Sequence, residues 1–145
     1  VVSGLVGITP ASGYVDVTGA LVIGMFSGAI GYFGVVKLKN MLGYDDTLDV
    51  FGIHGLVGIF GAIATGFLAN PEINGAAGLF YGNPGQVWSQ LVAVVATIAF
   101  AGIGSAILFK VTTLITGGGR VDDNLEDQGM DIGYHGEESF DTVDN

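Results

Sequence analysis

The sequence predicts an all-α membrane fold, and three observations support that prediction. Half of the 145 residues are apolar and only 12% are charged, about half the charged fraction of soluble domains. Three apolar runs are long enough, at about 1.5 Å per helical residue, to cross a hydrocarbon core of about 30 Å. The first of them has no polar face, which a water-soluble helix requires. These runs are 19–36, 50–69 and 87–115.

The acidic residues are concentrated at one end of the chain. The net charge is -10, and nine of the 14 acidic residues follow Ile115. The sequence therefore divides into an expected transmembrane domain, 1–115, and an acidic tail, 116–145. Such a charge distribution excludes nucleic acid as a partner, because phosphate contacts need clustered Lys and Arg. The absence of cysteine excludes a disulfide framework and a thiolate metal site.

The first two helical segments are separated by a proline. Residues 1–8 open within an apolar run and lack a basic n-region, so we interpret them as the end of a helix that begins outside this sequence, rather than as a signal peptide. We therefore expect the sequence to be a piece of a longer protein. Pro10 ends this segment. A helix of about 27 Å is expected over 19–36, with the Ser27 hydroxyl bonded to the carbonyl four residues back.

The third helix is expected over 46–69. Asp46 or Asp49 would cap its N-terminus, where a carboxylate meets the positive end of the helix dipole; ligand binding by these carboxylates is the alternative. Pro71 ends the helix. A loop rich in Gly and Asn then leads to the last helix, over 85–115. Its apolar run would measure about 43 Å, so this helix must tilt strongly or project from the membrane.

The four basic residues give the orientation. Three successive crossings place all four on one side of the membrane, and the opposite loops contain no Lys or Arg. The positive-inside rule therefore predicts that this side, which includes the tail, is cytoplasmic. The four residues are Lys37, Lys39, Lys110 and Arg120.

His54 is the one ionisable residue in the run 50–69. An ionisable group in hydrocarbon costs a few kcal/mol or more, and its default interpretation is a substrate or proton pathway. A neutral imidazole that is hydrogen-bonded inside a helix bundle, without a chemical role, is the alternative. Asp49 precedes His54 by five residues, about 500° of helix rotation, so these two side chains are not expected on one face. A partner for His54 should come from another helix.

The tail offers no clear catalytic or metal chemistry. Asp131, His135 and Glu137 contain metal-ligating groups, but their spacing gives no clear ligand geometry, and we expect neither a metal nor a cofactor. A single membrane histidine without a nucleophile or a carboxylate partner does not indicate an enzyme. The segment 129–137 mixes apolar, aromatic and turn-forming residues, which predicts docking onto a partner or onto the protein's own cytoplasmic face.

Three separated motifs resemble those of the Amt/Mep/Rh family of ammonium transporters, of the bacterial and archaeal Amt type. They are Gly4-Leu5-Val6-Gly7-Ile8-Thr9-Pro10-Ala11, the stretch Asp45-Asp46-Thr47-Leu48-Asp49-Val50-Phe51-Gly52-Ile53-His54-Gly55, and Gly129-Met130-Asp131 followed by His135-Gly136-Glu137. The resemblance implies the C-terminal part of an 11-helix inverted-repeat fold, comprising the end of helix 8, helices 9 to 11 and the cytoplasmic tail. It also implies a multi-pass protein of the inner cell membrane that assembles as a homotrimer with a pore in each subunit.

The resemblance assigns His54 to a pair of hydrogen-bonded pore histidines, whose other member lies ahead of Val1. Ammonium would lose a proton at the pore entrance, and ammonia would pass the histidines, with Val50 on the pore wall one turn earlier. Asp46 and Asp49 would lie near the cytoplasmic pore mouth. The tail would bind the PII signal-transduction protein through Gly129, Asp131, His135, Gly136 and Glu137. The alternatives are an ammonium sensor without significant flux and an inactive fragment of a transporter.

Overall fold

The computed structural model describes residues 1–137, and this part of the chain is helical without strands. It divides into two compact units, Val1–Ala99 and the residues from Phe100 onward, each described here by itself. The first unit contains α1 (Val2–Ile8), η1 (Thr9–Ala11), α2 (Val17–Tyr32), η2 (Phe33–Leu38), α3 (Lys39–Leu42), η3 (Phe51–Leu56), α4 (Val57–Leu68), α5 (Pro71–Asn74), η4 (Leu79–Tyr81) and the start of α6 (Gly85–Thr116).

Three continuous helices in the described residues are long and apolar enough to cross a membrane: Val17–Leu42, Phe51–Leu68 and Gly85–Thr116. The first begins two residues before the expected 19–36, because the Asp16 carboxylate accepts a hydrogen bond from the Gly19 amide at 2.8 Å and caps the helix. It continues past both lysines to Leu42, since lysine is a good helix former. Gly43, with φ of 63°, ends it in the left-handed region.

The third helix begins at Phe51, five residues later than the expected start at 46. Residues 46–49 form a turn instead, and Asp46 caps the helix from outside it through its side chain. The first segment of this helix, η3, and the segment η2 are both π-helical. A π-helical turn contains more residues than an α-helical turn and occurs often at functional sites.

The two π-helical segments touch through glycine backbones. A Cβ atom added at Gly34 would lie 2.9 Å from the Cα of Gly52 and 2.9 Å from a methyl carbon of Leu56. Only the absence of side chains at these two positions lets the backbones approach so closely. The contact joins the end of the first long helix to the beginning of the next.

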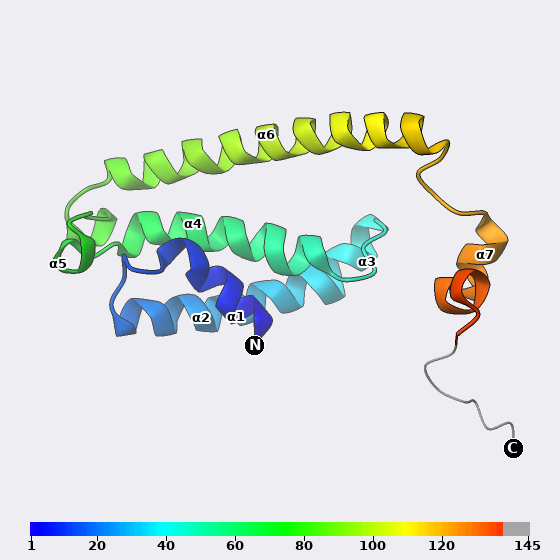
Figure 1. Cartoon of the computed structure of the whole chain (residues 1–145). Coiled ribbons are helices and arrows are strands. Elements are labelled where there is room, and N and C mark those ends of the chain that lie inside the picture. The colour runs from blue at the N-terminus through cyan, green and yellow to red at the C-terminus, as the bar shows by residue number, and fades with distance from the viewer. Residues whose placement is uncertain (138–145) are drawn as a thin grey trace, which may run out of the picture. The chain divides into compact units, whose positions relative to one another are not determined.

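The core of the first unit forms where α1, α2 and α4 lie side by side (Figure 1). Ile23 and Val57 are fully buried, and α1 and α4 approach so closely that a Cβ at Gly61 would lie 2.1 Å from the Gly7 carbonyl oxygen. Ser27 is also fully buried, but the predicted hydrogen bond of its hydroxyl is wrong: the Oγ has no partner among the described residues. Its hydroxyl instead packs directly against the backbone of Gly7.

The second unit folds back on itself after α6. Gly117, with φ of 78°, follows the last residue of α6, and the chain then forms α7 (Asp123–Gln128) and η5 (Asp131–His135). The Arg120 guanidinium pairs with the Glu126 carboxylate, with Nε donating to Oε2 at 2.8 Å. Residues 138–145, the last part of the expected acidic tail, lie outside the described residues.

Candidate pore segment and its turn

Residues 43–50 form a turn whose side chains bind the first turn of the helix that carries His54. Both carboxylate oxygens of Asp46 accept backbone hydrogen bonds, one from the Val50 amide at 2.9 Å and the other from the Phe51 amide at 2.8 Å. These amides belong to the first turn of the helix, where backbone donors have no helical partner. The negative carboxylate also meets the positive end of the helix dipole. Asp46 therefore holds the first turn by hydrogen bonding and by charge.

Asp49 makes a different contact from that of Asp46. Its Oδ1 accepts a hydrogen bond from Lys39 Nζ at 2.8 Å, and each of these side chains is 29% exposed. Lys39 Nζ also donates to the backbone carbonyl of Asp46 at 2.6 Å. One ammonium group therefore joins the end of the preceding helix to two aspartates of the turn, Asp46 and Asp49.

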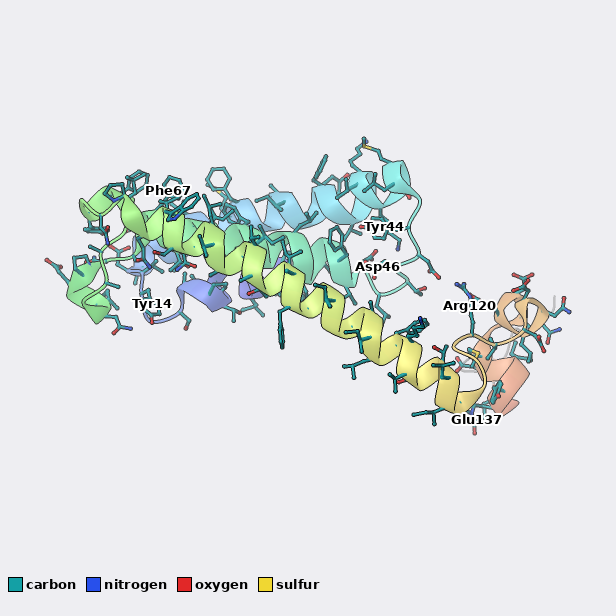
Figure 2. The ribbon with its side chains drawn as sticks, turned by 90° about the horizontal axis from the view of Figure 1, so that it is seen from above. Tyr14, Tyr44, Asp46, Phe67, Arg120 and Glu137 are labelled. Carbon is teal, nitrogen blue, oxygen red and sulfur yellow. The ribbon has the colours of Figure 1, made fainter. Side chains whose placement is uncertain are left out.

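An aromatic contact supports the same turn. The rings of Tyr44 and Phe51 meet edge to face, with centroids 5.5 Å apart and planes at 85°. Gly55, one turn after Phe51, leaves room for that ring, because a Cβ there would lie 2.9 Å from a ring carbon. Figure 2 shows Tyr44 and Asp46 at one end of the first unit and Tyr14 and Phe67 at the other.

His54 lies within η3 and its side chain is exposed. Between residues 1 and 137 the imidazole has no hydrogen-bond partner. Val50, four residues earlier, is 50% exposed, and a Cβ added at Gly58, four residues later, would meet nothing within 4 Å. Positions 50, 54 and 58 follow one another at about one turn; Val50 and His54 are exposed and Gly58 is half-buried. They form an apolar strip, with the imidazole as its polar group.

The structure brings together Asp46 and Asp49 among the residues singled out from the sequence. The tail residues lie in the second unit. There Gly129 has φ of 87° and Gly136 φ of 65°, and the Asp131 carbonyl accepts from the Glu137 amide at 3.0 Å. His135 is exposed. Within the described part of the chain, no three His, Asp or Glu side chains are grouped closely enough to hold a metal ion.

Lys39 is one of the basic residues that predict the orientation, but its ion pair with Asp49 was not predicted from the sequence. The signal that reveals it is the order of the residues: a lysine at the end of one helix, a short turn, and an aspartate at the start of the next. Antiparallel neighbouring helices bring such residues together, because the turn returns the chain to the level from which it departed. The ten-residue separation hides the pair from any rule based on neighbours within one helix.

Comparison with known proteins agrees with this helical architecture. The sequence model of the Ammonium Transporter Family matches residues 1–140. The chain is 42% identical over 141 residues to an ammonium transporter of Bacillus subtilis, which covers 96% of the chain and 35% of that relative. It is 44% identical over 140 residues to an ammonium transporter of Aquifex aeolicus, covering 97% of the chain and 33% of the relative. The chain thus spans about a third of the length of these relatives.

A solved structure supports the same conclusion at the level of the fold. The crystal structure of Saccharomyces cerevisiae Mep2 superposes with a TM-score of 0.77 at 33% identity, over 85% of this chain and 29% of that one. The family is one of membrane transporters and not of enzymes. Since its sequence model matches nearly the whole length and the apolar helices superpose on a solved member, this chain belongs to the Ammonium Transporter Family.

Proposed function

We propose that this chain, within a complete subunit, forms part of a path for ammonium or ammonia across the inner cell membrane. The observation that carries the proposal is the exposed imidazole of His54 on an otherwise apolar membrane helix. Exposure of this polar ring to lipid would cost free energy, whereas a position beside a conduit between helices would let it contact the substrate or a proton. The relatives of this chain bear the name ammonium transporter, which supplies the substrate class.

The chemistry of the strip suits a cation that must lose its charge to pass. Ammonium is costly to desolvate, whereas neutral ammonia enters an apolar channel at much lower cost. Imidazole exchanges protons near neutral pH. In the proposed path ammonium loses its proton at the entrance, ammonia passes Val50 and His54, and the proton crosses through or around the histidine pair and joins ammonia again on the other side. A second imidazole from outside this chain hydrogen-bonds to the His54 ring and fixes its tautomer.

The positions of the lysines support the proposed orientation of the chain in the membrane. Lys39 donates a hydrogen bond to the Asp46 carbonyl, and Lys37 lies two residues before it on the same helix. By the positive-inside rule we assign this end of the first unit to the cytoplasm. The proposal therefore puts the turn 43–50 at the cytoplasmic mouth of the path and the tail in the cytoplasm. The subunit is proposed to act as a homotrimer.

Replacing His54 by Ala tests the transport role. The complete subunit is reconstituted in proteoliposomes, and ammonium-driven current and ammonia flux are measured at equal amounts of inserted protein. The expected result is a large change in current or in selectivity for ammonium over other monovalent cations. The control is Thr113→Ala on α6, whose hydroxyl donates, within residues 1–137, to carbonyls of its own helix, at 2.6 Å to Phe109 and 3.1 Å to Lys110.

Unchanged current and selectivity in His54→Ala would refute the assignment. A wild-type subunit that binds ammonium without measurable flux would instead indicate an ammonium sensor. Flux in the wild type that disappears only in the His54 variant would support the proposed path.

The tail is proposed to dock a PII protein and so couple transport to nitrogen supply. Support comes from the compact turn of the second unit, where η5 ends in the left-handed Gly136 and the Glu137 amide closes onto Asp131. Binding of purified PII to the full tail and to a Gly136→Ala variant tests this. Loss of PII binding in the variant, with flux retained, is the expected result, and equal binding by both proteins would contradict it.

A further inference from the structure

The turn before His54 contains an unusual backbone conformation. Asp49 has φ of 56° and is the one non-glycine residue of the described chain in the left-handed region. Aspartate adopts this region more readily than most residues, but such a conformation persists where the surroundings hold it in place. The Asp49 carbonyl accepts a hydrogen bond from the Ile53 amide at 3.0 Å. The conformation of Asp49 therefore sets the position from which the helix carrying His54 starts.

Lys39 is the group that holds Asp49. Its ammonium donates to the Asp49 carboxylate at 2.8 Å and to the Asp46 carbonyl at 2.6 Å. Asp46 in turn accepts from the amides of Val50 and Phe51. The Lys39 ammonium is therefore bonded to Asp46 and to Asp49. Each of these aspartates in turn accepts hydrogen bonds from backbone amides at the start of the helix that carries His54. Among the described residues, the hydrogen bonds of Lys39 go to Asp46 and Asp49 and not to the imidazole.

A second contact fixes the same helix start from another direction. Gly52 touches Gly34 backbone to backbone, and both lie in π-helical segments. With the ion pair at Asp49 and the glycine contact at Gly52, the first turn is held on both sides of Phe51. A slip by one residue in an α-helix would rotate a side chain by about 100° and move it by about 1.5 Å. Loss of the π-helical hydrogen-bond pattern would cause a shift of this kind at His54.

We propose that the Lys39–Asp49 ion pair is a positioning element that sets the rotation of the π-helical turn carrying His54. The inference rests on the proposed function, since it concerns the path to which His54 is assigned. Lys39 acts through Asp49 and the backbone, so removing the ion pair should turn the imidazole without removing it. A displacement of about 1 Å at a working group can lower a rate by about a hundredfold.

The test uses the complete subunit in proteoliposomes and two measurements. The first is the maximal ammonium flux together with the half-saturating concentration. The second is the pair of imidazole ¹⁵N chemical shifts of His54 by solid-state NMR, which report the tautomer and hydrogen bonding of the ring. The first variant is Lys39→Met, which keeps a long apolar stem and removes the ammonium group. The second is Asp49→Asn, because asparagine tolerates the left-handed conformation and keeps one acceptor oxygen. The matched control is Lys37→Met, an exposed lysine two residues away on the same helix.

In Lys39→Met and Asp49→Asn we expect the maximal flux to fall about tenfold or more with little change in half-saturation, and the His54 shifts to move. Lys39→Arg should restore both, and Lys37→Met should match the wild type. If the Lys39→Met protein does not insert into the membrane, the flux and the His54 shifts of Asp49→Asn decide whether the proposal holds. Wild-type shifts and flux per folded molecule in the ion-pair variants would overturn the proposal, even if their thermal stability fell.

The two measurements also separate this inference from the proposed function. The NMR shifts need no transport, so they report the orientation of His54 even if His54→Ala leaves flux unchanged. In that case the transport role fails while the shifts still decide the positioning role. Moved shifts with unchanged flux in Lys39→Met would overturn the link between orientation and rate.

Discussion

Replacing Gly61 by Ala should destabilise the first unit through a single backbone contact. A Cβ at this position would lie 2.1 Å from the carbonyl oxygen of Gly7 and 3.2 Å from its Cα. No side-chain rotation can relieve this contact, because the obstacle is backbone. The two helices α1 and α4 must therefore separate by about 1 Å or more, and overpacking of this kind typically costs about 1–3 kcal/mol. We expect a value at the upper end of that range.

Gly58→Ala is the matched control for this experiment. It lies three residues earlier on the same helix, and its Cβ would meet nothing within 4 Å. Both substitutions gain the same intrinsic helix preference of about 1 kcal/mol for Ala over Gly, so their difference isolates the clash with Gly7. The free energy of unfolding is measured in detergent or bicelles by denaturant titration of the complete subunit. Equal stability of the two variants would refute the close packing of α1 on α4.

Two further predictions concern other contacts. Ser27→Ala should leave stability unchanged or raise it by about 1 kcal/mol, because it removes a buried hydroxyl without a partner; a loss above about 1 kcal/mol in the same unfolding assay would contradict this. In the tail, the hydrogen bond from Arg120 holds the pKa of Glu126 below its ordinary range. Because the folded-state pKa is lowered, the pair's contribution is present above the unfolded pKa and is lost as pH falls through the folded one. NMR should show the α7 turn loosening at acidic pH, and Glu126→Gln should abolish that pH dependence; a pH-independent tail in the unmodified protein would contradict the pairing.

Hydrophobic run length was sufficient to predict the number and type of the long helices. The runs 19–36 and 87–115 lie within helices long enough to span a membrane, and the run 50–69 exceeds its helix, Phe51–Leu68, by one residue at each end. Composition works well here because unsatisfied backbone groups cannot exist in lipid, so an apolar run of this length must become a helix. The helix ends were less predictable. Asp16 and Gly43 moved the ends of the first long helix beyond its uncharged run, since capping and left-handed termination depend on local geometry and not on hydropathy.

The individual residues of the candidate site could be predicted from the sequence, but the contacts between them could not. His54 stands out because it is an ionisable residue in an apolar run, and Asp46 because an acidic residue precedes a helix. The π-helical form of η3, the left-handed Asp49 and the pair with Lys39 depend on how two helices meet, and no spacing rule within one helix contains that information. The unbonded hydroxyl of Ser27 was mispredicted for the same reason, because its environment is the backbone of α1.

The central claim is that the His54 imidazole faces a conduit in the assembled transporter. The most direct test is an experimental structure of the complete subunit in lipid at a resolution that defines ring positions. We predict a second imidazole with a nitrogen about 2.7–3.2 Å from a His54 ring nitrogen, both rings bordering a narrow passage that continues past Val50. A His54 ring packed against lipid chains, or one in open water with no neighbouring ring, would contradict the account.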